Sequence, residues 1–161
     1  MKKVKIFGLF LIMSFLPFVL QAGSKVPSDL KVKYEFIQGG PEKGATIETY
    51  LLEGNKLTLT TDYIPTQYGS DASKRVKENK TYTMSKEKME ELWQIIENSR
   101  FMTWTDAPSQ RPPQGGNQSF TITANGKTAT HTMWENPNKE SFIDFSREFL
   151  KWAKQLMTIQ L

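Results

Sequence analysis

One histidine and no cysteine leave this chain few side chains for catalysis. Cysteine–histidine catalysis and zinc sites built from several Cys and His ligands are therefore excluded. A Ser-His-Asp triad would have to use His131, but the residue pattern pairs it with Phe120 on the apolar side of a hairpin. We therefore expect His131 to be a structural residue at the edge of the core. The sequence also lacks the glycine-rich nucleotide-binding motifs, the HExxH zinc motif and the GxSxG nucleophile motif.

Catalysis by two carboxylates stays open, because any two acidic residues could converge in the fold. The sequence favours no particular pair. Glu90 and Glu91 lie on the polar face of a predicted helix, where carboxylates commonly pair with neighbouring lysines. We therefore predict a protein that is not an enzyme and that uses no cofactor or metal.

Two segments rich in glycine and proline are the candidate contact sites for a partner. Gly39–Gly44 is a turn cluster, and Thr105–Asn117 is a long loop with three prolines and two glycines. Loops of that length without secondary structure are uncommon unless they bind something or are disordered. Binding residues often lie on loops that a rigid scaffold presents. The candidate contact residues are Gly39, Gly40, Pro41, Arg111, Pro112, Pro113, Gly115 and Gly116.

Three other features allow alternative interpretations. Threonines at alternate positions of a predicted hairpin could bind an ordered lattice such as ice or polysaccharide, although threonine is common on the wet face of a strand and sheet twist spoils a flat array. Trp134, Tyr50 and Tyr63 could stack on sugars or lipids, which gives an alternative function in binding an envelope polysaccharide or small ligand. Pro65–Asn79 contains a basic run, but acidic residues interrupt it, and we interpret it as a solvated connecting loop.

The first 22 residues have the pattern of a secretory signal peptide. Three lysines precede an apolar run from Ile6 to Leu20, and the small residues that follow predict cleavage after Ala22. Residues 23–161 then form a single domain behind a mobile leader at 23–29. Of 21 basic residues, the signal holds three, so 18 remain against 17 acidic residues, a net charge of +1. Steering toward nucleic acid is therefore not expected, and without cysteine the domain folds without disulfides.

The central packing element is a predicted amphipathic helix after Ser85. The Ser85 hydroxyl is a good N-cap, because it can accept a hydrogen bond from an unpaired amide of the first turn. Phe101 and Trp104 are expected to anchor the chain as it leaves the helix. The residues that repeat at helical spacing and should form the buried stripe are Met89, Leu92, Trp93 and Ile96.

Alternating apolar residues predict strands over Leu30–Phe36, Ala45–Glu53 and Lys56–Ile64, the last two joined by a tight turn. A short fourth strand begins near Thr81, before the helix. With antiparallel hairpins and no strand–helix–strand alternation, the order predicts an α+β fold. We expect an antiparallel sheet of about five to six strands with two helices packed on one face.

Asn125-Gly126 predicts a second hairpin with a two-residue turn. That turn fixes the register, which pairs Ala124 with Lys127, Ile122 with Ala129 and Phe120 with His131. One face is then apolar and the other is polar throughout, as in a sheet with one side on the core and one in water. A final helix is expected to begin with Asn136 as its cap and Pro137 in its first turn, and to bury a stripe that includes Phe142, Phe145, Phe149 and Trp152.

The same stretches resemble a known family. Tyr34–Gly40, Met84–Phe101 (MSKEKMEELWQIIENSRF), Ser119–Thr130 and the final helix follow the order and patterning of emfourin-type inhibitors of thermolysin-like metalloproteases, and of some exported bacterial α+β domains. The resemblance covers most of the chain after residue 22. The inhibitors are shorter, lack a signal peptide and have a smaller region at the place of residues 45–79. The resemblance implies a protease as partner, and it assigns no inhibitory residue.

The sequence therefore predicts an exported, non-enzymatic binding module of a bacterial periplasm or secretome. Its expected partner is a protein, contacted through the loops, and the family resemblance makes a protease the specific expectation. No nucleic acid partner and no membrane span after signal cleavage are expected.

Overall fold

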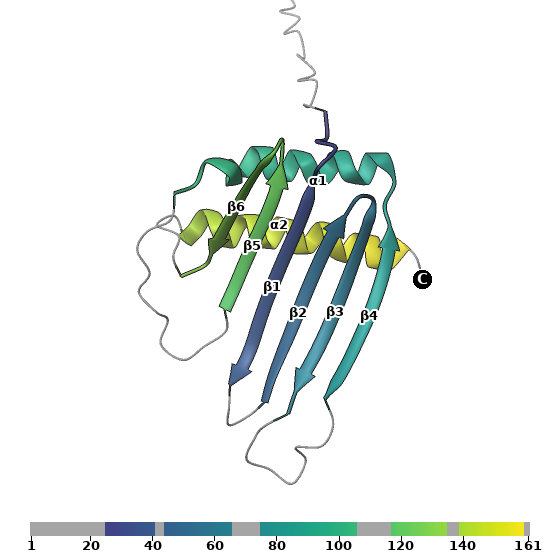
Figure 1. Cartoon of the computed structure of the whole chain (residues 1–161), viewed down its shortest axis with the longest axis vertical. Helices are drawn as coiled ribbons and strands as arrows, with labels where there is room; N and C mark the ends of the chain where they lie inside the picture. Colours follow the sequence, from purple (N-terminus) through teal and green to yellow (C-terminus); the bar gives the residue numbers. More distant parts are fainter. Residues whose placement is uncertain (1–24, 41–43, 66–74, 106–116, 135–138, 160–161) are drawn as a thin grey trace, which may run out of the picture.

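The computed structural model describes residues 25–40, 44–65, 75–105, 117–134 and 139–159. Its strands form one six-stranded antiparallel sheet in the order β4-β3-β2-β1-β5-β6, with two α-helices (Figure 1). The predicted α+β fold is confirmed. The strands are β1 (Lys31–Gly40), β2 (Gly44–Glu53), β3 (Lys56–Ile64), β4 (Val76–Thr83), β5 (Asn117–Ala124) and β6 (Lys127–Thr132), and the helices are α1 (Lys86–Ser99) and α2 (Lys139–Ile159), with a 3-10 turn, η1 (Phe101–Thr103), after α1.

Strands β1, β2 and β3 follow one another as antiparallel neighbours. Their alternating residues divide between the two faces of the sheet, as the period of a strand requires. Val32, Tyr34, Leu52 and Leu57 are buried on the face that carries the helices. The face without helices is called the outer face below. The strand bounds differ from the prediction mainly in β1, which continues through Gly40.

Strand β4 begins earlier than the sequence predicted. Pro65–Asn79 was expected to be a connecting loop, but residues 76–79 belong to β4 and pair with residues 60–63 of β3. This correction has a simple physical reason. An edge strand has a neighbour on one side only, and seven of the eight residues of β4 are exposed, so the apolar alternation that marks a half-buried strand is missing.

Helix α1 has the predicted cap and the predicted buried stripe. The Ser85 hydroxyl accepts a hydrogen bond from the Lys88 amide. Of the predicted stripe, Leu92, Trp93 and Ile96 are buried and Met89 is half-buried. The helix ends at Arg100, which adopts a left-handed conformation with φ 57°. Phe101 follows in η1 and is fully buried, so the predicted anchor at the exit from the helix is confirmed.

The β5–β6 hairpin has the register predicted from its two-residue turn, including the pair Phe120–His131. A residue far away in sequence stabilises this turn. The Asp29 carboxylate accepts hydrogen bonds from the amides of Asn125 (2.9 Å) and Gly126 (2.7 Å). These hydrogen bonds, and chiefly the one from Gly126, lower the pKa of Asp29 below its ordinary value. Residue 29 is therefore an ordered part of the fold, although the sequence placed it at the end of a mobile leader.

The core between sheet and helices is built of aromatic rings. Phe120 is fully buried at its centre. The ring centroid of Phe120 lies 4.4–6.1 Å from those of Tyr34, Phe101, Phe142, Phe145 and Phe149. Helix α2 is also tied to α1, because the indole nitrogen of Trp152 donates to the Lys88 carbonyl at 3.2 Å. The predicted cap of the final helix, Asn136 and Pro137, lies outside the described residues.

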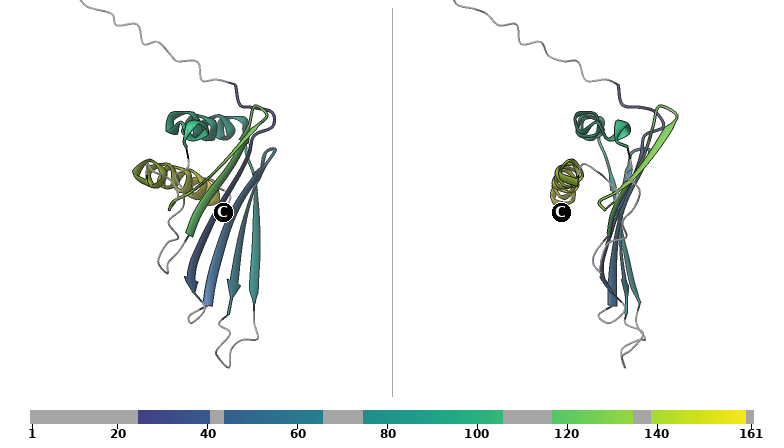
Figure 2. Two further views of the ribbon diagram at one scale, coloured as in Figure 1. Left: turned by 60° about the vertical axis from the view of Figure 1, so that its left-hand side comes forward. Right: turned by 90° about the vertical axis from the view of Figure 1, so that its left-hand side faces the viewer.

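Both helices lie on one side of the sheet and cross only part of it (Figure 2). Strands β1 to β4 continue well past α2, so their far ends carry no helix on either side. Within the described residues, no helix is long and apolar enough to cross a membrane. The predicted signal peptide, residues 1–22, lies outside the described part of the chain, and its prediction stands untested.

Candidate functional site

The part of the sheet beyond the helices contains or adjoins described residues of both segments that the sequence singled out: Gly39, Gly40 and Gly44 of the first, and Asn117, which pairs with Ile37, of the second. We call it the uncovered end and define it as residues 36–40, 44–48, 61–65 and 75–78. In an antiparallel sheet, alternate connections leave from the same end. The ends of β1 and β3 and the starts of β2, β4 and β5 all meet here (Figure 1). The described residues 40, 44, 64, 76 and 117 therefore lie at or next to this end, although they are far apart in sequence.

The uncovered end also exposes large apolar side chains. Among the described residues, four large hydrophobic side chains are clearly exposed: Tyr63 (42%), Ile64 (37%), Val76 (49%) and Ile143 (37%). The first three belong to the uncovered end, and Ile143 is on α2. Tyr63 and Val76 are cross-strand partners on the helix side, whereas Ile64 lies on the outer face. Single exposed hydrophobics are ordinary, but adjacent ones mark an interaction surface more often. Sequence reasoning missed Val76 because it interpreted Pro65–Asn79 as a solvated loop, and it placed Ile64 at the end of a strand without predicting its exposure.

The structure describes only some of the predicted contact residues. Gly39 and Gly40 are not loop residues, because they pair in β1 with Ala45 and Gly44 of β2. Gly39 has φ +103°, and a Cβ atom there would lie 2.2 Å from the Gly44 carbonyl oxygen. Glycine is thus required at position 39 by the close approach of the two strands. The remaining predicted contact residues, Pro41, Arg111, Pro112, Pro113, Gly115 and Gly116, lie outside the described residues.

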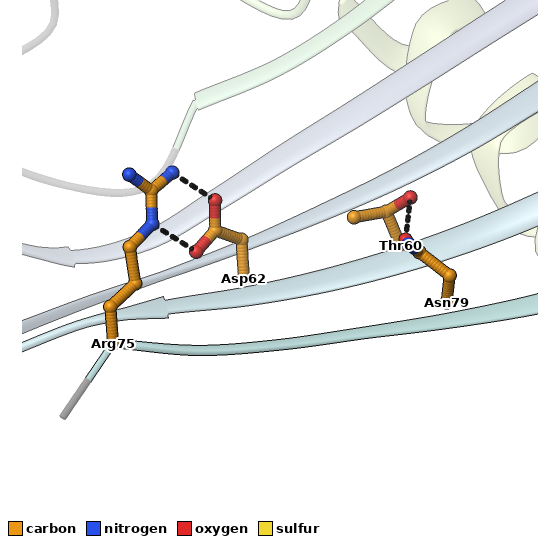
Figure 3. Close-up of polar contacts among 4 residues, drawn as sticks. All are labelled: Thr60, Asp62, Arg75 and Asn79. Atoms are coloured by element: carbon orange, nitrogen blue, oxygen red, sulfur yellow. Dashed lines mark hydrogen bonds and ion pairs between the residues drawn. The ribbon is translucent and has the colours of Figure 1, made fainter.

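An ion pair holds the start of β4 onto β3 at the uncovered end. The guanidinium of Arg75 donates to both carboxylate oxygens of Asp62, with an Nε–Oδ1 distance of 2.8 Å, and one terminal nitrogen points away from Asp62 (Figure 3). The hydrogen bonds from Arg75 lower the pKa of Asp62. Further along the same strands, the Thr60 hydroxyl donates to Asn79 Oδ1 at 2.7 Å. These contacts fasten an edge strand whose side chains otherwise have few neighbours.

His131 lies in the aromatic core, as the sequence predicted. Its side chain is buried, and its ring centroid is 4.7 Å from that of Phe101 and 5.5 Å from that of Trp104. Of the described residues, no three or more His, Cys, Asp or Glu side chains are grouped so that they could hold a metal ion. The surroundings of His131 are those of a packing residue.

The three aromatic residues proposed for stacking on sugars or lipids do not form one surface. Tyr50 is only 4% exposed, and its ring packs on Tyr34 and Phe149 in the core. Burial raises the pKa of the Tyr50 hydroxyl, as expected for a phenol removed from water. Trp134 follows β6 and is half-buried, with Lys139 Nζ 4.3 Å from its ring centre. Tyr63 is on β3, three strands away from β5.

The predicted polar face of the hairpin is part of the outer face of the sheet. Threonines of β5 and β6 pair across the strands, with hydroxyl oxygens 3.0 Å apart for Thr121–Thr130 and 2.8 Å for Thr123–Thr128. Threonines also occupy β3 and β4. The array is not continuous, because Lys31, Lys33 and Glu35 of β1 lie between the two threonine groups. A regular lattice would meet a charged ridge there.

A hollow of about 360 Å³ lies between the end of α1 and the β5–β6 turn. Its apolar wall includes Trp93, Met102 and Ala124, and charged residues stand at its rim. Trp93 is buried and Ala124 packs in the core, so the hollow is a shallow margin of the core. No pattern in the sequence predicts it.

No protein-family model matches the sequence, and no curated protein shows significant similarity to it. The resemblance to emfourin-type inhibitors therefore rests on element order and residue pattern alone. Likeness at that level suggests a fold more readily than a function.

Proposed function

We propose that this protein is an exported, non-enzymatic module that binds another protein through the uncovered end of its sheet. The observation that supports this proposal is the exposure of Tyr63 and Val76 beside each other on the helix side of the sheet, beyond the edge of α2. They form one cross-strand pair, and Phe36, which is half-buried, lies on the same face two strands away. A partner could bury this surface as a continuation of the layer that α1 and α2 form.

The dimensions of the uncovered end suit a protein partner. From Tyr34, which packs under α2, to Gly39 the chain advances five residues, or about 17 Å at 3.4 Å per residue. A packed helix or strand pair needs a strip about 10 Å wide. One secondary-structure element of a partner therefore fits between α2 and the end of the strands. Apolar anchors surrounded by polar side chains are also the usual composition of a protein interface.

A protease is the specific partner that the family resemblance implies. Inhibition would then follow from the uncovered end occupying the cleft of the enzyme. The alternative function, binding of an envelope polysaccharide or small ligand, has lost one of its three aromatic residues, since Tyr50 is buried in the core. The protein-binding proposal is therefore preferred.

Site-specific photo-crosslinking tests the proposal. A photoreactive phenylalanine analogue is placed at Tyr63, and in a matched variant at Ile143, which is similarly exposed but lies on α2. Each variant is incubated with the secreted and envelope fractions of the source organism. The expected result is a discrete crosslinked protein from position 63 and not from position 143. A second variant, Tyr63→Ser with Val76→Thr, should weaken recovery of that same protein while leaving the melting temperature nearly unchanged.

Two results would count against the proposal. Equal crosslinking from both positions would mean that the chain binds proteins nonspecifically. Absence of any crosslinked protein from position 63, with a correctly folded variant, would favour the polymer or small-ligand function. If a protease is recovered, its activity is assayed with the wild-type chain and with the double variant.

A further inference from the structure

The outer face of the sheet is unlike the helix side, because all of its acidic groups are matched by bases. Three carboxylates lie on it. Glu53 is 3.5 Å from Lys31, Glu35 is 3.0 Å from Lys33, and Asp62 binds Arg75. Two further lysines on this face, Lys56 and Lys77, have exposed side chains. Among the described residues the outer face thus has five cations and three carboxylates, a net charge of +2.

The helix side of the uncovered end has the opposite sign. Its charged side chains are Glu48 and Glu78, a net charge of −2. The positive charge is therefore a property of one face, although the mature chain as a whole is close to neutral. Such an asymmetry orients a protein on an anionic surface, with its basic face toward that surface.

The same face carries an apolar patch at the uncovered end. Ile37 and Ile47 are direct cross-strand neighbours and are half-buried, while Ile64 lies one row further out and is exposed. Lys77 is the cross-strand partner of Asp62 on this face, and Asp62 also binds Arg75, so both cations lie at the strand end that carries Ile64. Isoleucines and cations are thus adjacent on one open side of a sheet, where both helices lie on the other side (Figure 2).

We propose that the outer face of the sheet binds the surface of an anionic phospholipid bilayer. Lys56 and Lys77 would lie at the lipid phosphates, and Ile64 would enter the boundary between headgroups and acyl chains. Each lysine near such a surface strengthens binding, and buried apolar side chains add to it. An uncharged polysaccharide would gain nothing from the cations, and free phosphate would gain nothing from the isoleucines. A bilayer satisfies both kinds of side chain at once.

This bilayer contact goes beyond the proposed protein binding and is compatible with it. The bilayer would occupy the outer face, and the protein partner would occupy the helix side of the same strands. A chain exported as predicted would meet such a surface in the compartment where it works.

Vesicle co-sedimentation tests the bilayer proposal. The full chain is expressed with its own N-terminal segment and purified as the cell processes it. It is sedimented with vesicles of phosphatidylcholine alone, and with vesicles of phosphatidylcholine and phosphatidylglycerol in equal parts. We expect binding to the anionic vesicles only. The Lys56→Gln, Lys77→Gln double variant should lose about fivefold per lysine, or roughly 25-fold in total.

Matched controls distinguish binding by the outer face from nonspecific binding through charge or apolar side chains elsewhere. Lys86→Gln with Lys154→Gln removes the same charge from the exposed surfaces of the two helices and should leave binding within about twofold. Ile64→Ser should weaken binding about fivefold, whereas Ile143→Ser, at the same exposure, should have no effect. All four variants are checked for unchanged melting temperature.

Four outcomes would overturn the proposal. They are no sedimentation with either vesicle, equal sedimentation with both, equal losses in the two lysine pairs, and anionic binding that Ile64→Ser leaves unchanged. The last result, together with equally tight binding to a soluble anionic polymer such as heparin, would assign the face to polyanions instead of a bilayer.

Discussion

Substitution of Gly39 distinguishes a structural glycine from a partner contact. The new Cβ of Gly39→Ala would meet the Gly44 carbonyl oxygen at 2.2 Å, well inside contact distance, at a backbone φ of +103°. A positive φ costs an alanine about 1–2 kcal/mol. Moving the carbonyl would disturb the β1–β2 pairing and weaken hydrogen bonds worth about 1 kcal/mol each. The unfolded chain has less conformational entropy with alanine than with glycine, which offsets about 0.4–1 kcal/mol of this destabilisation. We therefore expect Gly39→Ala to lower the free energy of unfolding by about 3 kcal/mol.

Gly126→Ala is the matched control, because Gly126 also has a positive φ, +72°, but open space around its Cβ position. Gly126→Ala should lower the free energy of unfolding by only about 1 kcal/mol. Urea unfolding followed by tryptophan fluorescence measures both variants, and the difference of about 2 kcal/mol corresponds to roughly 5–10 °C in melting temperature. Equal losses in the two variants would refute the close approach of β1 and β2. A fully stable Gly39→Ala chain that no longer binds its partner would restore the contact interpretation of Gly39.

Three other predictions can be checked with the same chain. Trp93→Ala should lower the free energy of unfolding in urea by about 3–5 kcal/mol, because Trp93 is a buried residue of α1; a loss below about 1 kcal/mol would contradict its position. Asp62→Asn should be less stable than wild type near neutral pH. Because Arg75 lowers the pKa of Asp62 in the fold, that stability is present above the ordinary value of 3.8 and is lost as the pH falls below it, so the two unfolding curves should converge in acid. A gap that persists in acid would mean that the charge of Asp62 is not its source. Intact-mass spectrometry of the exported chain should show loss of residues 1–22, and a full-length mass would refute the signal peptide.

The regular elements of this fold could be predicted because their patterns are local. The Asn125-Gly126 turn fixes the pairing of Phe120 with His131 within eleven residues of chain. The stripe of Leu92, Trp93 and Ile96 follows from helical spacing alone. Where local evidence was absent, prediction failed. The start of β4 carries no alternation, because an edge strand with exposed side chains needs none.

The candidate site could be predicted only in part. The glycines at 39 and 40 were recognised as unusual, but a turn and a close strand crossing place the same demand on glycine, and the sequence does not separate them. The exposure of Tyr63 and Val76 depends on where α2 crosses the sheet, which no local pattern specifies. The Asp62–Arg75 ion pair likewise joins residues on either side of a long connection.

By itself, the sequence determined the elements, their faces and the class of fold, because propensity, capping and periodicity act over a few residues. It also determined what chemistry is missing, since one histidine and no cysteine exclude whole mechanisms. Only the tertiary structure decided which surfaces stay open. The two helices lie across one end of the sheet, so strands β1 to β4 extend beyond them with one basic and one acidic side. That arrangement depends on packing between distant segments, and it is what makes a binding surface out of ordinary strands.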